Sequence, residues 1–407
     1  MTSKINLSIL SGVAAAAVTV MAAGTANATF GMLPHCYGTV KCAMGGAGSA
    51  KAGAAVDAVI NPALAADMGN EYQVNAGWFW ADVKGKSSYA PATMANGETS
   101  SADSFPNMSM AVNYKIDDTS SFNLALVPGG GGASKWATSR TANLGSAVVD
   151  QEITYEMIYL QPTYAMKVGN ANYGVGGILS YATIKTDSRT GAFGLSGVED
   201  QKAKWFGAGF QVGGKWGMGD KGTAALNLRS PVWHQKADNY DGSVFNDPID
   251  TPAQIQAGVA FDATDSTTVA FDVKWVEWSQ GNTIGNEPNL SNTAARGFGW
   301  KNQTIIMLGL EHKLDDATTL RAGYSHGNSP IEDGGVLANY LFPAITTDHF
   351  TAGGSYNMGG GMELGMSAYY SPKASQCDDQ SKFGIAAHGT CLSHQQQGFQ
   401  LSFKNDF

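Results

Sequence analysis

Residues 71–82 read "EYQVNAGWFWAD" and alternate between two kinds of side chain. The even positions are apolar: Tyr72, Val74, Ala76, Trp78 and Trp80. The odd positions are mostly polar or small: Glu71, Gln73, Asn75, Gly77 and Phe79. Because successive side chains of a strand point to opposite faces, this stretch predicts a strand with one apolar and one largely polar face.

The same alternation recurs to the end of the chain, for example in "TTVAFDVKW" (267–275) and "GFQLSFKNDF" (398–407). We predict fourteen strands, over residues 71–82, 105–115, 120–128, 153–167, 172–186, 202–216, 222–234, 252–262, 267–278, 302–314, 318–326, 347–357, 362–371 and 397–407. Tight turns follow the even-numbered strands, and long connections follow the odd-numbered ones. This asymmetry, with an even strand number, is typical of an outer-membrane β-barrel.

The composition supports a barrel over a helical membrane protein. Hydrophobic residues make up 43% of the chain and charged residues 14%, with 51 glycines. Beyond the N-terminus no window offers the roughly 20 consecutive apolar residues of a transmembrane helix. Lipid accepts only helices or closed barrels, because backbone polar groups must be paired internally. The net charge of −9 offers nucleic acid no basic surface.

The first 28 residues have the features of an export signal. One charge, Lys4, precedes an apolar run, and Ala26-Asn27-Ala28 forms a small-residue cleavage signal. We therefore expect a signal peptide over 1–28, export through the periplasm and a Gram-negative outer-membrane location. Residues 29–70 would then form an N-terminal unit, and residues 71–407 the barrel.

Residues 43–69, "AMGGAGSAKAGAAVDAVINPALAADMG", are small and apolar. Glycines and charges interrupt them too often for a membrane-spanning helix, yet they are too apolar for a solvated linker. We predict a plug of short helices inside the barrel, within a hatch over residues 29–70. Asn61 would cap a helix beginning at Pro62, and Gly69 would end it.

The four cysteines are expected to form disulfides, because the periplasm is oxidising. Cys36 and Cys42 belong to the N-terminal unit, whereas Cys377 and Cys391 share the last long loop. Of the three possible connectivities we expect the local one. No CxxC motif suggests redox chemistry.

Motifs for catalysis or cofactors are weak. "GMGDKG" (217–222) matches a dinucleotide-binding pattern but falls in a predicted hairpin turn. The seven histidines show no metal-ligand spacing, and nothing places a nucleophile, base and carboxylate together. We expect no cofactor, no metal and no enzymatic activity, with a barrel-embedded hydrolase as the alternative.

Several charges fall on the predicted inner face: Asp272, Lys274, Glu311, Lys313, Arg321 and Glu363, with Arg229 nearby in strand order. A polar lumen accounts for such a set by itself. The functional hypothesis is that Arg229, Lys274 or Arg321 binds an anionic head group.

The N-terminal block resembles a known family. "CYGTVKCAMGGAGSAKAGAAVDAVINPA" (36–63), with Asn61-Pro62-Ala63 before the first strand, is similar to the hatch of FadL-type outer-membrane transporters, the long-chain fatty acid and aromatic-hydrocarbon channels. Residues 251–279 and 318–358 resemble later strand pairs of that family. The resemblance covers nearly the whole mature chain. Two departures are the cysteines at 36 and 42 and the unusually apolar "VLANYLFPAI" (336–345).

The resemblance implies passive uptake of hydrophobic compounds, with long-chain fatty acids as the default substrate. Alkanes, aromatic hydrocarbons and terpenes are alternatives by the same route, and a diffusion porin or a structural barrel is the rival class. The expected partners are the hydrophobic solute, outer-membrane lipid and lipopolysaccharide. The barrel assembly machinery would recognise the aromatic terminus, Phe407.

We predict a ligand pocket where the mature N-terminus meets inward apolar side chains. Its residues would be Phe30, Met32, Leu33, Phe79, Val276, Ile305 and Met307. The alternative is that these side chains only pack the plug against the barrel wall and bind no ligand.

A wall opening is predicted in the third strand. Pro128 cannot donate to a strand ladder, and Gly129 to Gly132 weaken pairing. Strand 120–128 either ends there, or, as the family resemblance implies, is distorted at Val127, Pro128 and Gly129. The distortion would open the wall sideways and bring the middle of the strand, around Asn123 to Val127, near Asn61, Pro62 and Ala63.

Overall fold

The computed structural model describes residues 29–86, 97–140, 148–188, 198–236, 247–288, 297–378 and 389–407. The expected signal peptide, residues 1–28, lies outside the described residues. Fourteen long strands form one antiparallel sheet: β1 (Glu71–Lys86), β3 (Ser104–Lys115), β4 (Ser120–Arg140), β5 (Val148–Val168), β6 (Ala171–Ser188), β7 (Val198–Met218), β8 (Gly222–Arg229), β10 (Gln254–Thr264), β11 (Thr267–Val276), β12 (Gln303–Lys313), β13 (Thr318–Gly327), β14 (Asp348–Gly359), β15 (Met362–Asp378) and β16 (Thr390–Asp406). Two short strands, β2 (Glu98–Thr99) and β9 (Trp233–His234), extend it.

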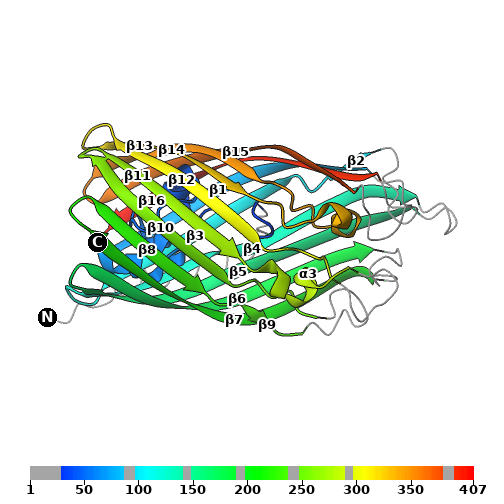
Figure 1. Ribbon diagram of the computed structural model, residues 1–407, viewed down its shortest axis with the longest axis horizontal. Coiled ribbons are helices and arrows are strands. Elements are labelled where there is room, and N and C mark those ends of the chain that lie inside the picture. Colours follow the sequence, from blue (N-terminus) through cyan, green and yellow to red (C-terminus); the bar gives the residue numbers. More distant parts are fainter. Residues whose placement is uncertain are drawn as a thin grey trace.

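The sheet closes on itself. Each long strand pairs with its neighbours in chain order, and β16 pairs with β1 from Glu71↔Asp406 to Lys86↔Cys391. Figure 1 shows the resulting barrel, with strands tilted against its long axis. The predicted closed barrel of fourteen antiparallel strands is confirmed.

The two faces of the sheet differ as the alternation predicts. Outward side chains are large and apolar, such as Trp80, Phe206 and Leu401. Inward side chains of the same strands include buried amides such as Gln73 and Asn75. An apolar outer surface with a polar interior is the arrangement that a bilayer requires of a barrel.

Tight turns join the strands at one end of the barrel. Asp117, for example, accepts bonds from the backbone N–H groups of Thr119 and Ser120, both at 2.8 Å. Phe407 lies at this same end, where its N–H donates to the carbonyl of Asn70 (2.9 Å). The long connections therefore lie at the other end, as in outer-membrane barrels, where they face outside the cell.

The predicted end of the third strand is wrong. The expected strand 120–128 continues as β4 through Pro128 and the glycines to Arg140, pairing with β5. A register shift between Pro128 and Gly130 accommodates the proline, which has no N–H to donate.

The described chain also contains short helices. Three lie before β1: α2 (Gly38–Ala43), η1 (Ala55–Val59) and η2 (Pro62–Asp67). Four lie in the long connections: η5 (Trp278–Gln280), α3 (Asn282–Gly285), η7 (Asp333–Gly335) and η8 (Leu337–Asn339). Within the described ranges, no helix has the length and apolarity needed to cross a membrane.

Both disulfides are local. Cys36 is bonded to Cys42 in the N-terminal segment. Cys377 and Cys391 are bonded at directly facing positions of β15 and β16. The second bond joins the two strands near the end that carries the long connections.

We predict that Cys377 and Cys391 resist thiol labelling in the folded protein without reductant. Each lies on a partly or fully exposed outer position, so a reduced thiol there would react with a maleimide. Mass spectrometry of the labelled peptides measures this. Complete labelling of both cysteines before reductant is added would contradict the bond.

Candidate functional site

The N-terminal segment, residues 29–70, lies inside the barrel (blue in Figure 1). Inward side chains from several strands donate to its backbone. Asn123 of β4 reaches the carbonyl of Ala55 (2.9 Å), and Gln211 of β7 reaches that of Ala58 (3.1 Å). Much of the polar inner face therefore holds this segment in place.

Asp272 is the clearest such anchor. Its carboxylate accepts bonds from the backbone N–H groups of Gly48 (2.9 Å) and Ser49 (3.0 Å) and from the side chain of Gln256 (2.7 Å). The carboxylate is fully buried, so these donors replace the water that it would otherwise bind. The inward charge of Asp272 therefore holds the N-terminal segment in place.

The Asn61-Pro62-Ala63 motif lies at the start of η2. The Asn61 carboxamide accepts from the Ala63 N–H (3.0 Å) and donates to the carbonyls of Ser49 (3.0 Å) and Gly214 (3.2 Å). Gly174 of β6 and Gly213 of β7 leave room for the motif, since a Cβ at either position would collide with it. The motif thus packs on β6 and β7. η2 also contacts β4, the strand that holds the predicted neighbours Asn123 to Val127.

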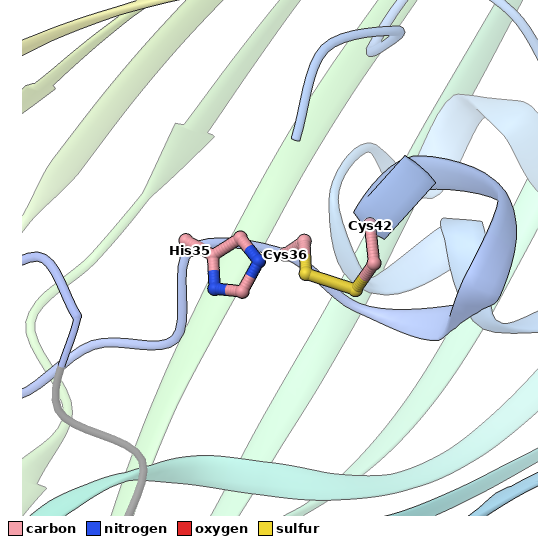
Figure 2. Close-up of side chains that lie close together, drawn as sticks. All are labelled: His35, Cys36 and Cys42. Carbon is pink, nitrogen blue, oxygen red and sulfur yellow. A yellow bond between two sulfur atoms is a disulfide. The ribbon is translucent and has the colours of Figure 1, made fainter. Parts of the chain in front are cut away.

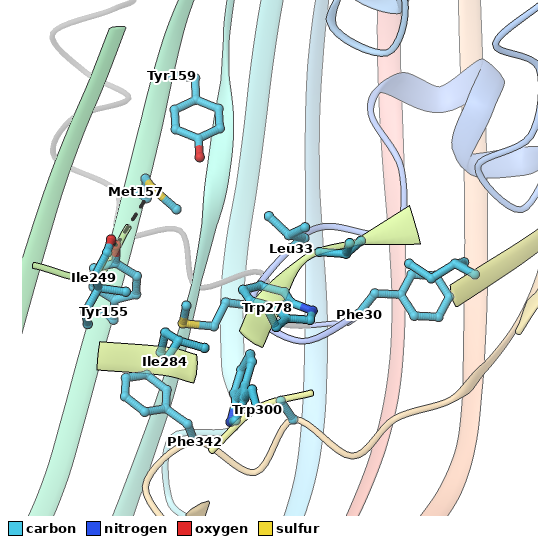
Figure 3. Packing of buried hydrophobic residues seen from close by; sticks show 14 of the residues in the cluster. Phe30, Leu33, Tyr155, Met157, Tyr159, Ile249, Trp278, Ile284, Trp300 and Phe342 are labelled. Atoms are coloured by element: carbon cyan, nitrogen blue, oxygen red, sulfur yellow. Dashed lines mark hydrogen bonds between the residues drawn. The ribbon is translucent and has the colours of Figure 1, made fainter. Parts of the chain in front are cut away.

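A tight turn at Phe30–Leu33 begins the described chain. Phe30 and Leu33 exchange both backbone hydrogen bonds, each at 3.1 Å. Gly31 has φ +63° and packs against the indole rings of Trp278 and Trp300, where a Cβ would clash. The two indoles meet edge to face, 4.9 Å apart, and Figure 3 shows them beneath the turn. Glycine is therefore required here twice, by conformation and by contact.

Most of the predicted pocket residues belong to one buried apolar cluster. Phe30, Met32, Leu33, Val276, Ile305 and Met307 are all in it. Phe79 is not a member, but its ring stacks on Phe105, 4.9 Å away, and Phe105 packs against the cluster. Sequence reasoning missed Trp278, Trp300, Tyr155 and Phe342, which complete the cluster in Figure 3. The only sequence signal for Phe342 was the unusual apolarity of residues 336–345.

The three predicted head-group cations differ sharply in their surroundings. Arg229 is buried and donates to the carbonyl of Val59 (2.9 Å) and to two glutamine side chains. Arg321 is paired with Glu311 (2.7 Å) near the tight-turn end. Both guanidinium groups are thus occupied by the protein, which argues against them as head-group ligands.

Of the three predicted cations, Lys274 is the one whose ammonium is not used in a hydrogen bond or ion pair with a described residue. It lies on β11 between Asp272 and Val276 and faces Ile305 on β12. It is half-buried, and it has no hydrogen bond or ion pair within the described residues. Burial and the neighbouring Lys274 charge lower the pKa of His35 in the N-terminal segment to about 3. His35 is therefore neutral near pH 7.

His35, Cys36 and Cys42 come close enough together to suggest a metal site (Figure 2). Zinc and similar ions bind cysteine as thiolate. The two sulfur atoms are bonded to each other, so the trio offers an ion a single imidazole. The arrangement is a disulfide beside a buried histidine.

The barrel wall is interrupted between β3 and β4. Their ladder runs from Lys115↔Ser121 to Met110↔Leu126 and stops. Residues 104–109 of β3 pair with β1 alone, while β4 continues along β5. Among the described residues, hydrogen bonding between β4 and the preceding chain resumes at Lys135, whose carbonyl accepts from the Ser101 N–H (2.8 Å) and whose N–H donates to the Ser100 hydroxyl (3.0 Å).

The interruption faces the Phe30–Leu33 turn. Gly131 of β4 donates its N–H to the carbonyl of Met32 (2.9 Å). Residues 127–132 are all buried, whereas a wall strand normally alternates. The predicted opening residues Val127, Pro128 and Gly129 thus lie beside the apolar cluster.

Comparison with known proteins identifies the family to which this barrel belongs. A family profile described as "Outer membrane protein transport protein (OMPP1/FadL/TodX)" matches residues 14–398. The chain belongs to the FadL/TodX family. Its members are outer-membrane barrels of Gram-negative bacteria that transport hydrophobic compounds, and this chain is an outer-membrane channel of that kind.

Solved structures share the fold at low sequence identity. The Pseudomonas putida toluene transporter TodX aligns with a TM-score of 0.69 and 16% identity, over 92% of this chain and 99% of that one. A Pseudomonas aeruginosa FadL homologue aligns at 0.67 and 17%, over 93% and 100%. The Ralstonia pickettii toluene transporter TbuX aligns at 0.66 and 14%, over 92% and 99%. No curated protein matches the chain.

We predict that Asp272→Ala loosens the N-terminal segment while the barrel stays closed. The backbone N–H groups of Gly48 and Ser49 would lose their buried acceptor, at a cost of roughly 1–3 kcal/mol. Hydrogen exchange should rise selectively around residues 45–55, and heat-modifiable gel mobility should not change. Asp315→Ala, in an exposed tight turn, is the matched control. Unchanged exchange at 45–55 would show that Asp272 does not anchor the segment.

Proposed function

We propose that this FadL/TodX-family channel takes up amphipathic hydrophobic compounds with an anionic head, with long-chain fatty acids as the default substrate. The single observation that carries the proposal is Lys274. It is a half-buried lysine beside an apolar cluster, with no ion pair to a described residue.

The surroundings of Lys274 suit the two ends of such a molecule. A carboxylate placed at the ammonium would form a charge-assisted hydrogen bond, which is stronger than a neutral one. The chain would lie against Trp278, Trp300 and Phe30, where burial stabilises it by about 25 cal/mol per Å². Aromatic hydrocarbons could use the apolar part alone, and for them Lys274 would be irrelevant.

The filled interior supports a selective channel over a diffusion porin. The described part of the N-terminal segment is buried almost throughout, and side chains from many strands hold it. A general porin needs a water-filled lumen. A solute would therefore need a route other than the barrel axis.

We place that route at the interrupted wall. The β3–β4 gap adjoins Met32 and Tyr159, so a solute leaving the apolar cluster there would enter lipid without returning to water. The buried Pro128 and its neighbouring glycines keep this part of the ladder unpaired with β3. We also propose that residues 1–28 are a signal peptide, which is removed when the chain is exported.

We predict that Lys274→Met lowers uptake of a labelled long-chain fatty acid at least roughly tenfold, because a hydrogen bond to a charged group contributes about 1.5–3 kcal/mol. Toluene uptake should change less than about twofold. Lys274→Arg should retain fatty acid uptake. Lys313→Met, at the tight-turn end of β12, is the control for loss of one positive charge.

Equal fatty acid uptake by wild type and Lys274→Met would contradict the anionic-head proposal. If toluene uptake persisted in both, the channel function would stand and the substrate would be an uncharged hydrocarbon. Heat-modifiable mobility of every variant shows that the barrel has assembled.

A cross-link across the wall should stop uptake. Ser109 and Val127 are the next positions beyond the last pair, Met110↔Leu126. We expect a disulfide between Ser109→Cys and Val127→Cys to abolish transport of both fatty acid and toluene, with partial recovery after reduction. The matched control joins Lys115→Cys and Ser121→Cys, which already face each other in the ladder. Undiminished transport by the locked barrel would require an axial route.

A further inference from the structure

The outer face of the barrel carries a lysine-lined cavity at the end far from Phe407. Lys84 and Lys86 of β1 and Lys373 of β15 line it, and its volume is about 480 Å³. The channel proposed above makes no use of this surface, which faces away from the interior. All three lysines are exposed.

Strand register explains why the lysines converge. Lys84 pairs with Ser393 of β16, which in turn pairs with Ser375 of β15. Paired positions point to the same face of a sheet. Small side chains on the middle strand thus form a floor, and lysines on the two flanking strands form its sides. Strands two apart are about 10 Å from each other, a span that two lysine side chains can close around one anion.

The next row of the sheet fixes this geometry. Lys86 pairs with Cys391, which is bonded to the facing Cys377. The disulfide ties β15 to β16 at the rim of the cavity. The strands that present the lysines are therefore held together covalently, beside β1 in an unbroken ladder.

Described residues compensate the charges of the cavity only in part. Lys84 contacts Asp82 at 2.9 Å, but both side chains are about half exposed (51% and 48%), and exposed pairs of this kind contribute little. Lys86 and Lys373 have no hydrogen bond or ion pair with a described residue. Glu98 is the one carboxylate among the lining residues. The described lining residues therefore carry more positive than negative charge, although the net charge of the chain is −9.

Aromatic side chains fix the height of the cavity relative to the membrane. Trp80 and Tyr370 are exposed on the outer face, on either side of Gln397. Outer-membrane barrels carry such aromatic side chains at the membrane interfaces. Lys84 is four residues beyond Trp80 on the same strand, about 13 Å along it. The lysines therefore lie at the level of lipid head groups, directly above surface suited to acyl chains.

We propose that Lys84, Lys86 and Lys373 form a binding site for the phosphate groups of a phosphorylated glycolipid of the outer leaflet, the lipid A part of lipopolysaccharide. The phosphates would lie over Ser393 and Ser375 between the lysines. The acyl chains would run down the barrel past Trp80 and Tyr370. Each lysine near a charged lipid surface adds to such binding.

The test measures lipid A binding to the full-length channel in detergent by native mass spectrometry. The wild type should retain bisphosphorylated lipid A, and the triple variant Lys84→Gln, Lys86→Gln, Lys373→Gln should bind it at least tenfold more weakly. Replacing the same three residues by arginine should preserve binding. The matched control, Lys115→Gln, Lys167→Gln, Lys313→Gln, removes three lysines from the tight-turn end and should change affinity less than twofold.

Two further arms identify the ligand. Dephosphorylated lipid A should bind wild type as weakly as bisphosphorylated lipid A binds the triple variant, and millimolar inorganic phosphate should not displace the lipid. Equal binding by wild type and the glutamine variant, equal binding of dephosphorylated lipid, or displacement by free phosphate would each overturn the assignment. If the triple variant fails to assemble, Lys86→Gln and Lys373→Gln are measured singly, each with an expected loss of about threefold.

Discussion

Hydrocarbon cannot hydrogen-bond, so each backbone N–H and carbonyl of a membrane-spanning segment needs a partner within the protein. This constraint explains why the fourteen strands close, with β16 returning to β1 along its whole length. It also makes the interruption between β3 and β4 significant. The freed N–H of Gly131 is satisfied by the carbonyl of Met32, so the N-terminal segment supplies from inside what the neighbouring strand does not.

The interior follows from the same constraint. An inward strand face that is polar needs partners as well, and residues 29–70 supply their backbone for this purpose. Asp272, Asn123 and Gln211 each form a hydrogen bond with this backbone. Phe30, Met32 and Leu33 of the segment belong to the same buried apolar cluster as Trp278 and Trp300. A single short segment thus fills the lumen and forms one side of an apolar site at the wall.

Much of this architecture could be predicted from sequence, because alternation reports directly on which side of a wall a residue lies. The strand number, the two faces and the capping of η2 by Asn61 follow from local patterns. What could not be predicted depends on contacts between distant residues. No local sequence pattern shows that Arg321 forms an ion pair with Glu311 or that Arg229 donates to the carbonyl of Val59. The same holds for the packing of residues 61–63 on β6 and β7. The continuation of β4 through Pro128 was missed because proline normally ends a paired strand, whereas here a bulge accommodates it.

The central claim is that the apolar cluster beside Lys274 receives the solute before it reaches the wall. The most direct measurement is a crystal structure of the channel soaked with a long-chain fatty acid brominated at its end, located by anomalous scattering. The account predicts a bromine peak among the apolar side chains around Trp278 and Trp300, with carboxylate density at the ammonium of Lys274. Bromine found only on the lipid-facing surface or along the barrel axis, with Lys274 unoccupied, would contradict it.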